Sequence, residues 1–132
     1  MKLVETDSSF ELHISSAVTD YYVISNNTKY FYKRMVIPSL LVNFFFEVDS
    51  ELKYLYLYFV EDRVFLSIEE LSDIKFSRRK LMKFKDKNSY FINLNNTSLT
   101  KHSISVKDSV VFVVSADSVL NSVSNICIEL LF

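Results

Sequence analysis

The chain of 132 residues contains no glycine, although average usage of about 7% would place roughly nine in a chain of this length. Glycine adopts positive φ angles most readily and lets a backbone approach a phosphate without a Cβ in the way. The P-loop, the dinucleotide-binding fingerprint and the glycine-flanked nucleophile elbow all require it. The sequence therefore excludes these sites, and it predicts that asparagine takes the left-handed positions of tight turns.

Apolar residues recur with period two more often than with the helical period of about 3.6. Phe10, Leu12 and Ile14, for example, alternate with polar residues, which is typical of a half-buried strand. Beyond this first strand, we expect strands at 21–24, 30–36, 40–48, 52–60, 63–68, 80–85, 90–94, 103–106, 109–115 and 125–132.

Polar tetrapeptides and tripeptides separate these segments. Residues 25–28, Ser-Asn-Asn-Thr, predict a hairpin, and 49–51 and 61–62 predict two further reversals. A capping-box pattern at 67–70 is followed by apolar residues at helical spacing, so we expect one short helix over about 68–76. Further turns or loops are expected at 86–89, 95–98 and 116–124, the last of which could instead form one helical turn.

The pattern of roughly eight to ten short strands with frequent turns favours a mainly β protein. We expect an antiparallel β-sandwich or a closed β-barrel rather than a βαβ architecture. No repeat, low-complexity segment or linker interrupts the sequence, so residues 1–132 are expected to form a single all-β domain. Pro38, the only proline, is expected at a bend or in an edge strand.

Several features bear on location. The single cysteine, Cys127, cannot form an internal disulfide, so a reducing compartment fits best. The first residues turn acidic at Glu5 and do not resemble a signal peptide. The longest apolar stretch, 35–46, is shorter than the ~20 residues needed to cross a bilayer. We expect no membrane span and a cytoplasmic or otherwise intracellular location, or a virion if the Lys-, Asn- and Ile-rich composition reflects a viral or phage genome.

Charge is unevenly distributed along the chain, although the net charge is only −1. Segment 47–73 holds eight acidic residues against two basic ones, whereas segment 75–87 holds one acidic residue and seven basic ones. The basic residues of this second segment, the basic run, are Lys75, Arg78, Arg79, Lys80, Lys83, Lys85 and Lys87. They could bind phosphates, meet an acidic face of a neighbouring subunit, or act as solvated charges that protect an edge strand.

Three tyrosines, Tyr54, Tyr56 and Tyr58, are spaced by two and share one face of an expected strand, and we call them the tyrosine row. The opposite face carries two leucines and a phenylalanine, a natural core set. A strand that is apolar on both faces is expected to be central and covered on both sides. The tyrosine row could contact another protein, stack on nucleic-acid bases, or pack under a loop or helix of the same domain.

The residues suited to catalysis or metal binding are few and widely separated. A zinc site needs three or four ligands, whereas the chain offers only His13, His102 and Cys127 as nitrogen or sulfur ligands. Cys127 lies between isoleucines, so it is expected to be a packing residue rather than a nucleophile. We predict no catalytic, cofactor-binding or metal-binding residues, and we expect no cofactor and no enzymatic activity.

Two functional hypotheses remain. The first is a non-enzymatic structural or protein–protein interaction module, such as an accessory subunit of a virion or another large assembly, which binds a protein partner or copies of itself. It rests on the lack of a catalytic constellation, the uneven charge, and an apolar last strand at 126–132, which its own sheet or a partner must cover. The alternative is a small nucleic-acid-binding β-barrel, which requires the basic run and the tyrosine row to share one side of the fold.

Overall fold

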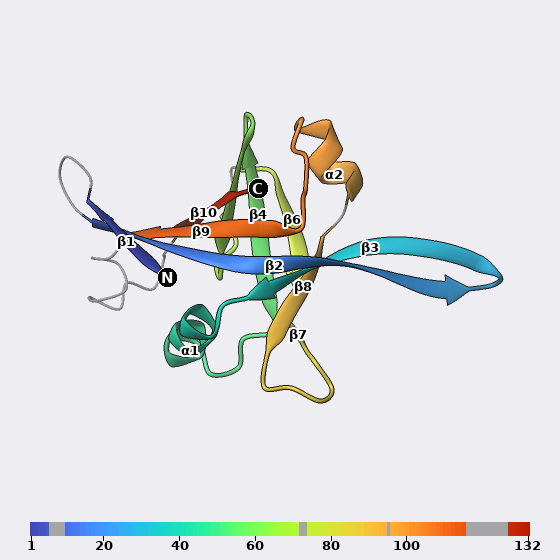
Figure 1. The fold of residues 1–132 in the computed structure, drawn as a ribbon, viewed down its shortest axis with the longest axis horizontal. Helices are drawn as coiled ribbons and strands as arrows, with labels where there is room; N and C mark the ends of the chain where they lie inside the picture. The colour runs from blue at the N-terminus through green and yellow to red at the C-terminus, as the bar shows by residue number, and fades with distance from the viewer. Residues whose placement is uncertain (6–9, 72–73, 95, 116–126) are drawn as a thin grey trace.

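The computed structural model describes the chain except residues 6–9, 72–73, 95 and 116–126. It is mostly antiparallel β-structure, as the period-two pattern predicts (Figure 1). The elements in chain order are β1 (Lys2–Glu5), β2 (Phe10–Ser25), β3 (Thr28–Ile37), α1 (Ser39–Val48), β4 (Tyr54–Val60), β5 (Arg63–Ser67), β6 (Phe76–Lys80), β7 (Met82–Lys83), β8 (Tyr90–Leu94), α2 (Asn96–Lys101), β9 (Ser109–Ser115) and β10 (Cys127–Leu131).

The strands form one ten-stranded sheet in the order β6-β4-β5-β10-β9-β2-β3-β8-β7, with β1 paired to the first part of β2. β6 and β7 stand at opposite ends of this order, yet only Leu81 separates them in the chain. The N–H of Leu81 donates to the carbonyl of Lys53 at 2.8 Å. Because this segment pairs first with β4 and then with β8, it brings the two ends of the sheet together. The sheet is thus nearly closed into a barrel, which confirms the expected fold class.

The core lies on the concave side of the sheet, where the inward-facing residues of the strands meet one side of α1. Leu55, Leu66, Ile92 and Phe112 come from four different strands and are fully buried. Phe45 of α1 is fully buried in the same cluster. The last strand, β10, lies between β5 and β9, so the protein's own sheet pairs with both of its edges.

The expected strand at 40–48 is wrong, because Ser39–Val48 forms helix α1. Pro38 marks the bend between β3 and this helix, and its carbonyl accepts a hydrogen bond from the N–H of Val42 at 3.0 Å. The turn expected at 49–51 is present, with the N–H of Leu52 donating to the carbonyl of Asp49 at 3.2 Å, but it follows helix α1 and so does not join two strands of a hairpin. The aromatic run favours a strand on intrinsic preference, but its apolar residues also recur at helical spacing and are buried as a helix. Those buried residues are Leu41, Val42, Phe44 and Phe45.

The expected helix over 68–76 is also wrong. Residues 68–71 and 74–75 are irregular, and β6 begins at Phe76. The hydroxyl of Ser67 accepts the N–H of Glu69 at 3.2 Å, as a cap would, but the chain then turns toward Tyr58. The Tyr58 hydroxyl donates to the carbonyl of Glu69 at 2.6 Å and accepts the N–H of Leu71. These bonds occupy backbone groups that a helix would have needed.

The remaining differences are smaller. The expected strand at 80–85 is divided between β6 and β7, and 103–106 is irregular rather than a strand. The expected turn at 95–98 lies partly outside the described residues, and α2 begins at Asn96. The loop expected at 116–124 lies entirely outside them. The turn at 61–62 is confirmed, with Glu61 at a φ of 57° between β4 and β5.

Candidate functional site

The pairing of β4 with β6 places part of the basic run beside the tyrosine row. In this antiparallel pair Tyr54 lies opposite Lys80, and Tyr56 lies opposite Arg78. Directly opposed residues project from the same face of a sheet. Two of the seven basic residues therefore share the face of the tyrosine row, as the nucleic-acid hypothesis requires.

The tyrosine row is mostly covered by the protein itself. Tyr58 is only 1% exposed, under the irregular segment that its hydroxyl holds in place. Tyr56 is half-buried and packs against Tyr58 and Phe76, with ring centroids 6.5 and 5.5 Å apart. Tyr54 is the exception, at 36% exposure, and its ring lies 4.5 Å from the guanidinium of Arg78. One ring at most is accessible to a flat ligand.

The rest of the basic run does not converge on this face. Arg79 lies opposite Leu55 and so points to the inner side of the sheet, where its guanidinium bonds the hydroxyl of Ser77 at 3.1 Å. Burial lowers the pKa of Arg79. Lys83 is exposed on β7, and the exposed Lys75, Lys85 and Lys87 lie outside the strands. The structure thus distributes the run over several surfaces.

The two histidines make separate contacts, and neither belongs to a group of potential metal ligands in the described residues. His13 lies 3.3 Å from the carboxylate of Glu11 on β2. His102 does not join a core strand as expected; its ring stacks on Phe59 at 4.6 Å, and its Nδ1 lies 3.4 Å from the carbonyl of Glu61. Within the described parts of the chain, no group of three His, Cys, Asp or Glu side chains could hold a metal ion. No helix in this described part combines the length and the apolar character needed to cross a membrane.

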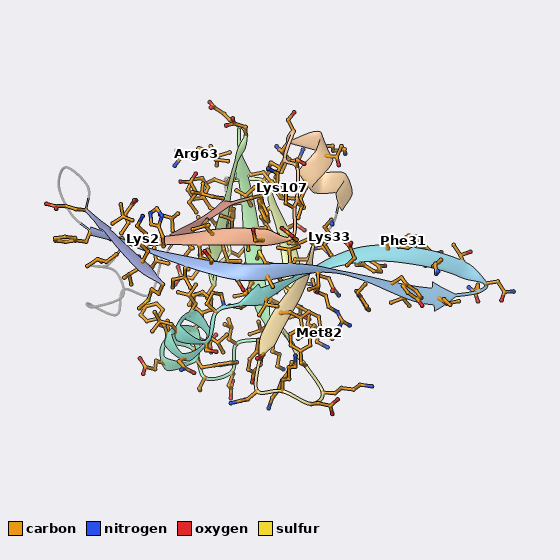
Figure 2. The ribbon with its side chains drawn as sticks, viewed as in Figure 1. Lys2, Phe31, Lys33, Arg63, Met82 and Lys107 are labelled. Atoms are coloured by element: carbon orange, nitrogen blue, oxygen red, sulfur yellow. The ribbon has the colours of Figure 1, made fainter. Side chains whose placement is uncertain are left out.

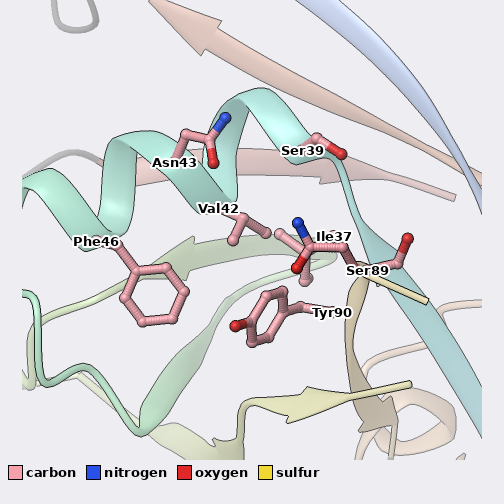
Figure 3. Close-up of a pocket in the computed structure, with 8 residues that line it drawn as sticks. Ile37, Ser39, Val42, Asn43, Phe46, Ser89 and Tyr90 are labelled. Atoms are coloured by element: carbon pink, nitrogen blue, oxygen red, sulfur yellow. The ribbon is translucent and has the colours of Figure 1, made fainter. Parts of the chain in front are cut away.

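A cavity of about 220 Å³ lies between α1 and the start of β8 (Figure 3). Val42 and Phe46 of the helix and Tyr90 of β8 form its apolar side. Its polar lining consists of the side chains of Ser39, Asn43, Asn88 and Ser89. No carboxylate, histidine, lysine or arginine lines the cavity, and ligand pockets are usually larger, at about 300–1,000 Å³. The cavity therefore gives no support to a catalytic function.

A second, shallower depression of about 400 Å³ contains an ion pair between β5 and β10. Arg63 donates to both carboxylate oxygens of Glu129, at 2.8 and 2.9 Å. These bonds lower the pKa of Glu129. Because Arg63 lies on β5 and Glu129 on β10, the pair is a structural clamp between two strands of the barrel.

The clamp predicts a pH dependence of stability. A carboxylate whose pKa is lower in the folded chain than in the unfolded chain stabilises the fold. The full contribution is present above the unfolded pKa of about 4.3. It is lost as the pH falls through the folded pKa. We expect Glu129→Gln to lower the urea midpoint at neutral pH and to lower it less at a pH below ~4. Glu47→Gln, on the exposed side of α1, is the control for losing one carboxylate. An equal loss for Glu129→Gln at both pH values would contradict the assignment.

Sequence reasoning missed the most unusual surface of the molecule, a two-stranded arm. β9 pairs with β2 only as far as Ala17, and β8 pairs with β3 only from Lys33. Residues 19–32, which we call the arm, therefore pair only within β2 and β3, as far as the described chain shows. Figure 1 shows the arm projecting well beyond the barrel.

The arm ends in the turn that the sequence predicts. Ser25 pairs with Thr28, and the two residues between them, Asn26 and Asn27, have φ angles of 51° and 64°. Two successive residues with positive φ make the tight turn whose twist matches that of paired strands. Asparagine thus takes the place of glycine, as expected.

Large apolar side chains on the arm are exposed to solvent. Tyr22, Ile24 and Phe31 lie on one face and are 54%, 64% and 67% exposed; Figure 2 labels Phe31 on the arm. Alternation along β2 and β3 places these residues on the face that carries the buried Val18 and Met35 in the barrel. The core-facing side of both strands therefore continues beyond the barrel, where its large apolar side chains are exposed within the described part of the protein. The other face exposes further apolar residues, Val23 and Tyr30.

The base of the arm is held by a cation stacked on aromatic rings. The guanidinium of Arg34 lies 3.7 Å from the ring centroid of Tyr21 and 4.5 Å from that of Phe91 in β8. Its Nε and the neighbouring Asn93 Oδ1 are buried without a hydrogen-bond partner in the described part of the protein. A buried cation–π contact of this kind contributes about 2 kcal/mol, so the arm leaves the barrel from a firm base.

Comparison with protein-family models, with curated proteins and with solved structures finds no match to this chain. The arm, rather than a likeness to another protein, is therefore the basis for a functional proposal. Its sequence signal is visible in retrospect. Residues 21–24, Tyr-Tyr-Val-Ile, and 30–32, Tyr-Phe-Tyr, are apolar on both faces although they flank a short turn.

Proposed function

We propose that this chain is a non-enzymatic protein–protein interaction module of a larger assembly, and that the arm is its docking element. The observation that carries the proposal is the exposed continuation of the core face, formed by Tyr22, Ile24 and Phe31. A two-stranded hairpin without a covered face is only marginally stable in water. Contiguous exposed apolar surface on a soluble protein typically marks a contact site.

The position of these residues supports docking more than chance exposure. Burying a large apolar side chain completely contributes about 1.5–3 kcal/mol, and the arm places three of them side by side without using them in its own fold. The ion pair of Lys33 with Asp20, at 2.7 Å, lies on the same face next to the barrel. The surface is thus an apolar centre with a polar margin, the usual anatomy of a protein interface.

The test replaces two arm residues in one variant, Ile24→Ser with Phe31→Ser. The matched control is Leu131→Ser, because Leu131 is also a large exposed residue but lies on β10, within the barrel. We expect the wild type and the control to retain the same purified or cross-linked protein partner, and the arm variant to lose it at least tenfold. Equal retention by all three proteins, with circular dichroism showing that all are folded, would overturn the proposal.

A second candidate function, nucleic-acid binding, is favoured by one observation, the exposed ring of Tyr54 between Arg78 and Lys80. Binding of this kind would weaken as salt rises, because counterions are released from the phosphates. A double charge reversal, Lys80→Glu with Lys83→Glu, therefore separates the two functions, because it removes positive charge that would bind phosphates. If the chain is an interaction module, the wild type and this variant should cause the same small rise in the fluorescence anisotropy of a labelled single-stranded oligonucleotide at low salt. Salt-sensitive binding that only the wild type shows would favour the nucleic-acid function instead.

A further inference from the structure

The β2 edge of the arm is open to another strand. The N–H of Val18 points away from β3 and donates to the carbonyl of Asp108 at 2.9 Å, at the start of β9. Backbone groups alternate in direction along an antiparallel strand, so those of Asp20, Tyr22 and Ile24 point the same way as those of Val18. No described segment of the chain lies on that side of the arm. Its polar backbone groups are therefore free to pair with another strand.

The two edges of the arm differ in how they are protected. The β3 edge carries Lys29 and Lys33, and lysine on an edge strand discourages pairing with another strand. Lys29 also covers the rings of Tyr22 and Phe31, at 4.3 and 5.8 Å. The β2 edge over residues 19–25 has one charge, Asp20, and neither lysine nor proline. The β2 edge is consequently the one suited to strand addition.

The β2 edge is complementary to a second copy of itself. Two identical strands that pair antiparallel about a two-fold axis present the same residues to each other. With the axis at Val23, Tyr22 of each copy lies opposite Ile24 of the other, which is a favourable aromatic–β-branched pair. The outward backbone groups of both residues then bond across the axis. No like charges meet, because Asp20 lies opposite the asparagine turn of the second copy.

This register also fits the space beside the barrel. The turn of the second copy, Asn26 and Asn27, ends beside Asp20, just before the point where Asp108 already occupies the N–H of Val18. A pairing about the β3 edge centred on Phe31 would instead set Lys29 of one copy against Lys33 of the other. The charges therefore select the β2 edge.

From this geometry we propose that the partner of the arm is a second copy of this chain, joined through antiparallel pairing of the two β2 edges over residues 20–25. The inference rests on the proposed function and specifies its partner. The pairing makes a four-stranded sheet from two arms, with a barrel at each end. Only six residues of each copy would pair, far fewer than the roughly 20–30 residues a side of typical specific interfaces, so we expect a dissociation constant on the order of tens of micromolar.

The experiment places opposite charges on the two-fold axis. Val23 is partly exposed, so Val23→Lys and Val23→Glu can each keep the charge in water while placing it against its own copy. Sedimentation velocity over a concentration series should show a dimer for the wild type and monomers for each variant alone. An equimolar mixture should form a dimer again, and native mass spectrometry should find one copy of each variant in it.

Three results would overturn the pairing: a wild type that stays monomeric at every concentration, a Val23→Lys variant as dimeric as the wild type, or a mixture that stays monomeric. If the Val23 variants also lose a different protein partner that the wild type retains, the self-pairing is wrong and the interaction module stands. If the wild type dimerises and the Ile24→Ser, Phe31→Ser variant dimerises equally well, both the pairing and the docking role of the arm are wrong.

Discussion

Replacing Phe45 with alanine should lower the free energy of unfolding by about 3–5 kcal/mol, the usual cost of removing a fully buried phenylalanine. Phe45 has no exposed surface and lies in α1, where it packs beside Phe44 in the core of the barrel. The loss combines the transfer of the ring out of the core with the cavity that it leaves. Urea unfolding, followed by circular dichroism, measures the change.

The control for this prediction lies on the same helix. Leu40 is exposed on α1, so Leu40→Ala should change stability by less than about 0.5 kcal/mol. Similar losses for Phe45→Ala and Leu40→Ala would contradict the placement of α1 against the core. They would favour the strand that intrinsic preference alone predicts for this segment.

Removing most of the arm should abolish association while leaving the barrel folded. The variant replaces residues 22–31 with Asn-Gly, which joins Tyr21 to Tyr32 by the shortest favourable hairpin turn. These two tyrosines are already opposed in the arm, and Arg34 stacks on the ring of Tyr21, so the base of the arm is retained. We expect a monomer at every concentration and a change in unfolding free energy below about 1 kcal/mol.

This variant separates two roles for the arm. A shortened chain that is folded but monomeric supports an arm used for docking. A shortened chain that loses several kcal/mol, measured by urea unfolding, would show that residues 22–31 stabilise the barrel itself. A shortened chain that still associates like the wild type would place the contact elsewhere. Phe45→Ala is the reference for this comparison, because it gives the loss of unfolding free energy expected for a core residue.

Much of the fold follows from local rules that the sequence carries openly. Alternation along 10–14 and 109–115 places Ile14 and Phe112 in the core, as period two requires. The asparagines at 26 and 27 take the positive φ angles that a chain without glycine must assign to other residues. These features depend on neighbours in sequence, so they can be read without the tertiary structure.

The errors arise where long-range contacts decide between local alternatives. The aromatic run in Ser39–Val48 satisfies both a strand and a helix pattern, and burial against the barrel selects the helix. The capping pattern after Ser67 fails because the hydroxyl of Tyr58, distant in sequence, bonds the backbone at Glu69 and Leu71. The closure of the sheet through Leu81 likewise depends on pairing partners far along the chain.

The candidate site shows the same division. Pairing of β4 with β6 joins Tyr54 to Lys80, a proximity that no sequence spacing reveals. The arm was missed because its composition is that of a buried hairpin, and only the lengths of the neighbouring strands show that no described strand pairs with it. The positions where β9 and β8 stop pairing, near Ala17 and Lys33, are therefore the decisive observation.

The most direct measurement places a photo-crosslinking amino acid at Ile24, the most exposed apolar residue of β2, and a second at Leu131 as the control. Irradiation of the full chain in its native cellular setting, followed by mass spectrometry, identifies what each position touches. We predict a discrete protein adduct from Ile24, with a second copy of this chain as its main component, and none from Leu131. Adducts from Leu131 alone, or from neither position, would contradict a docking role for the arm.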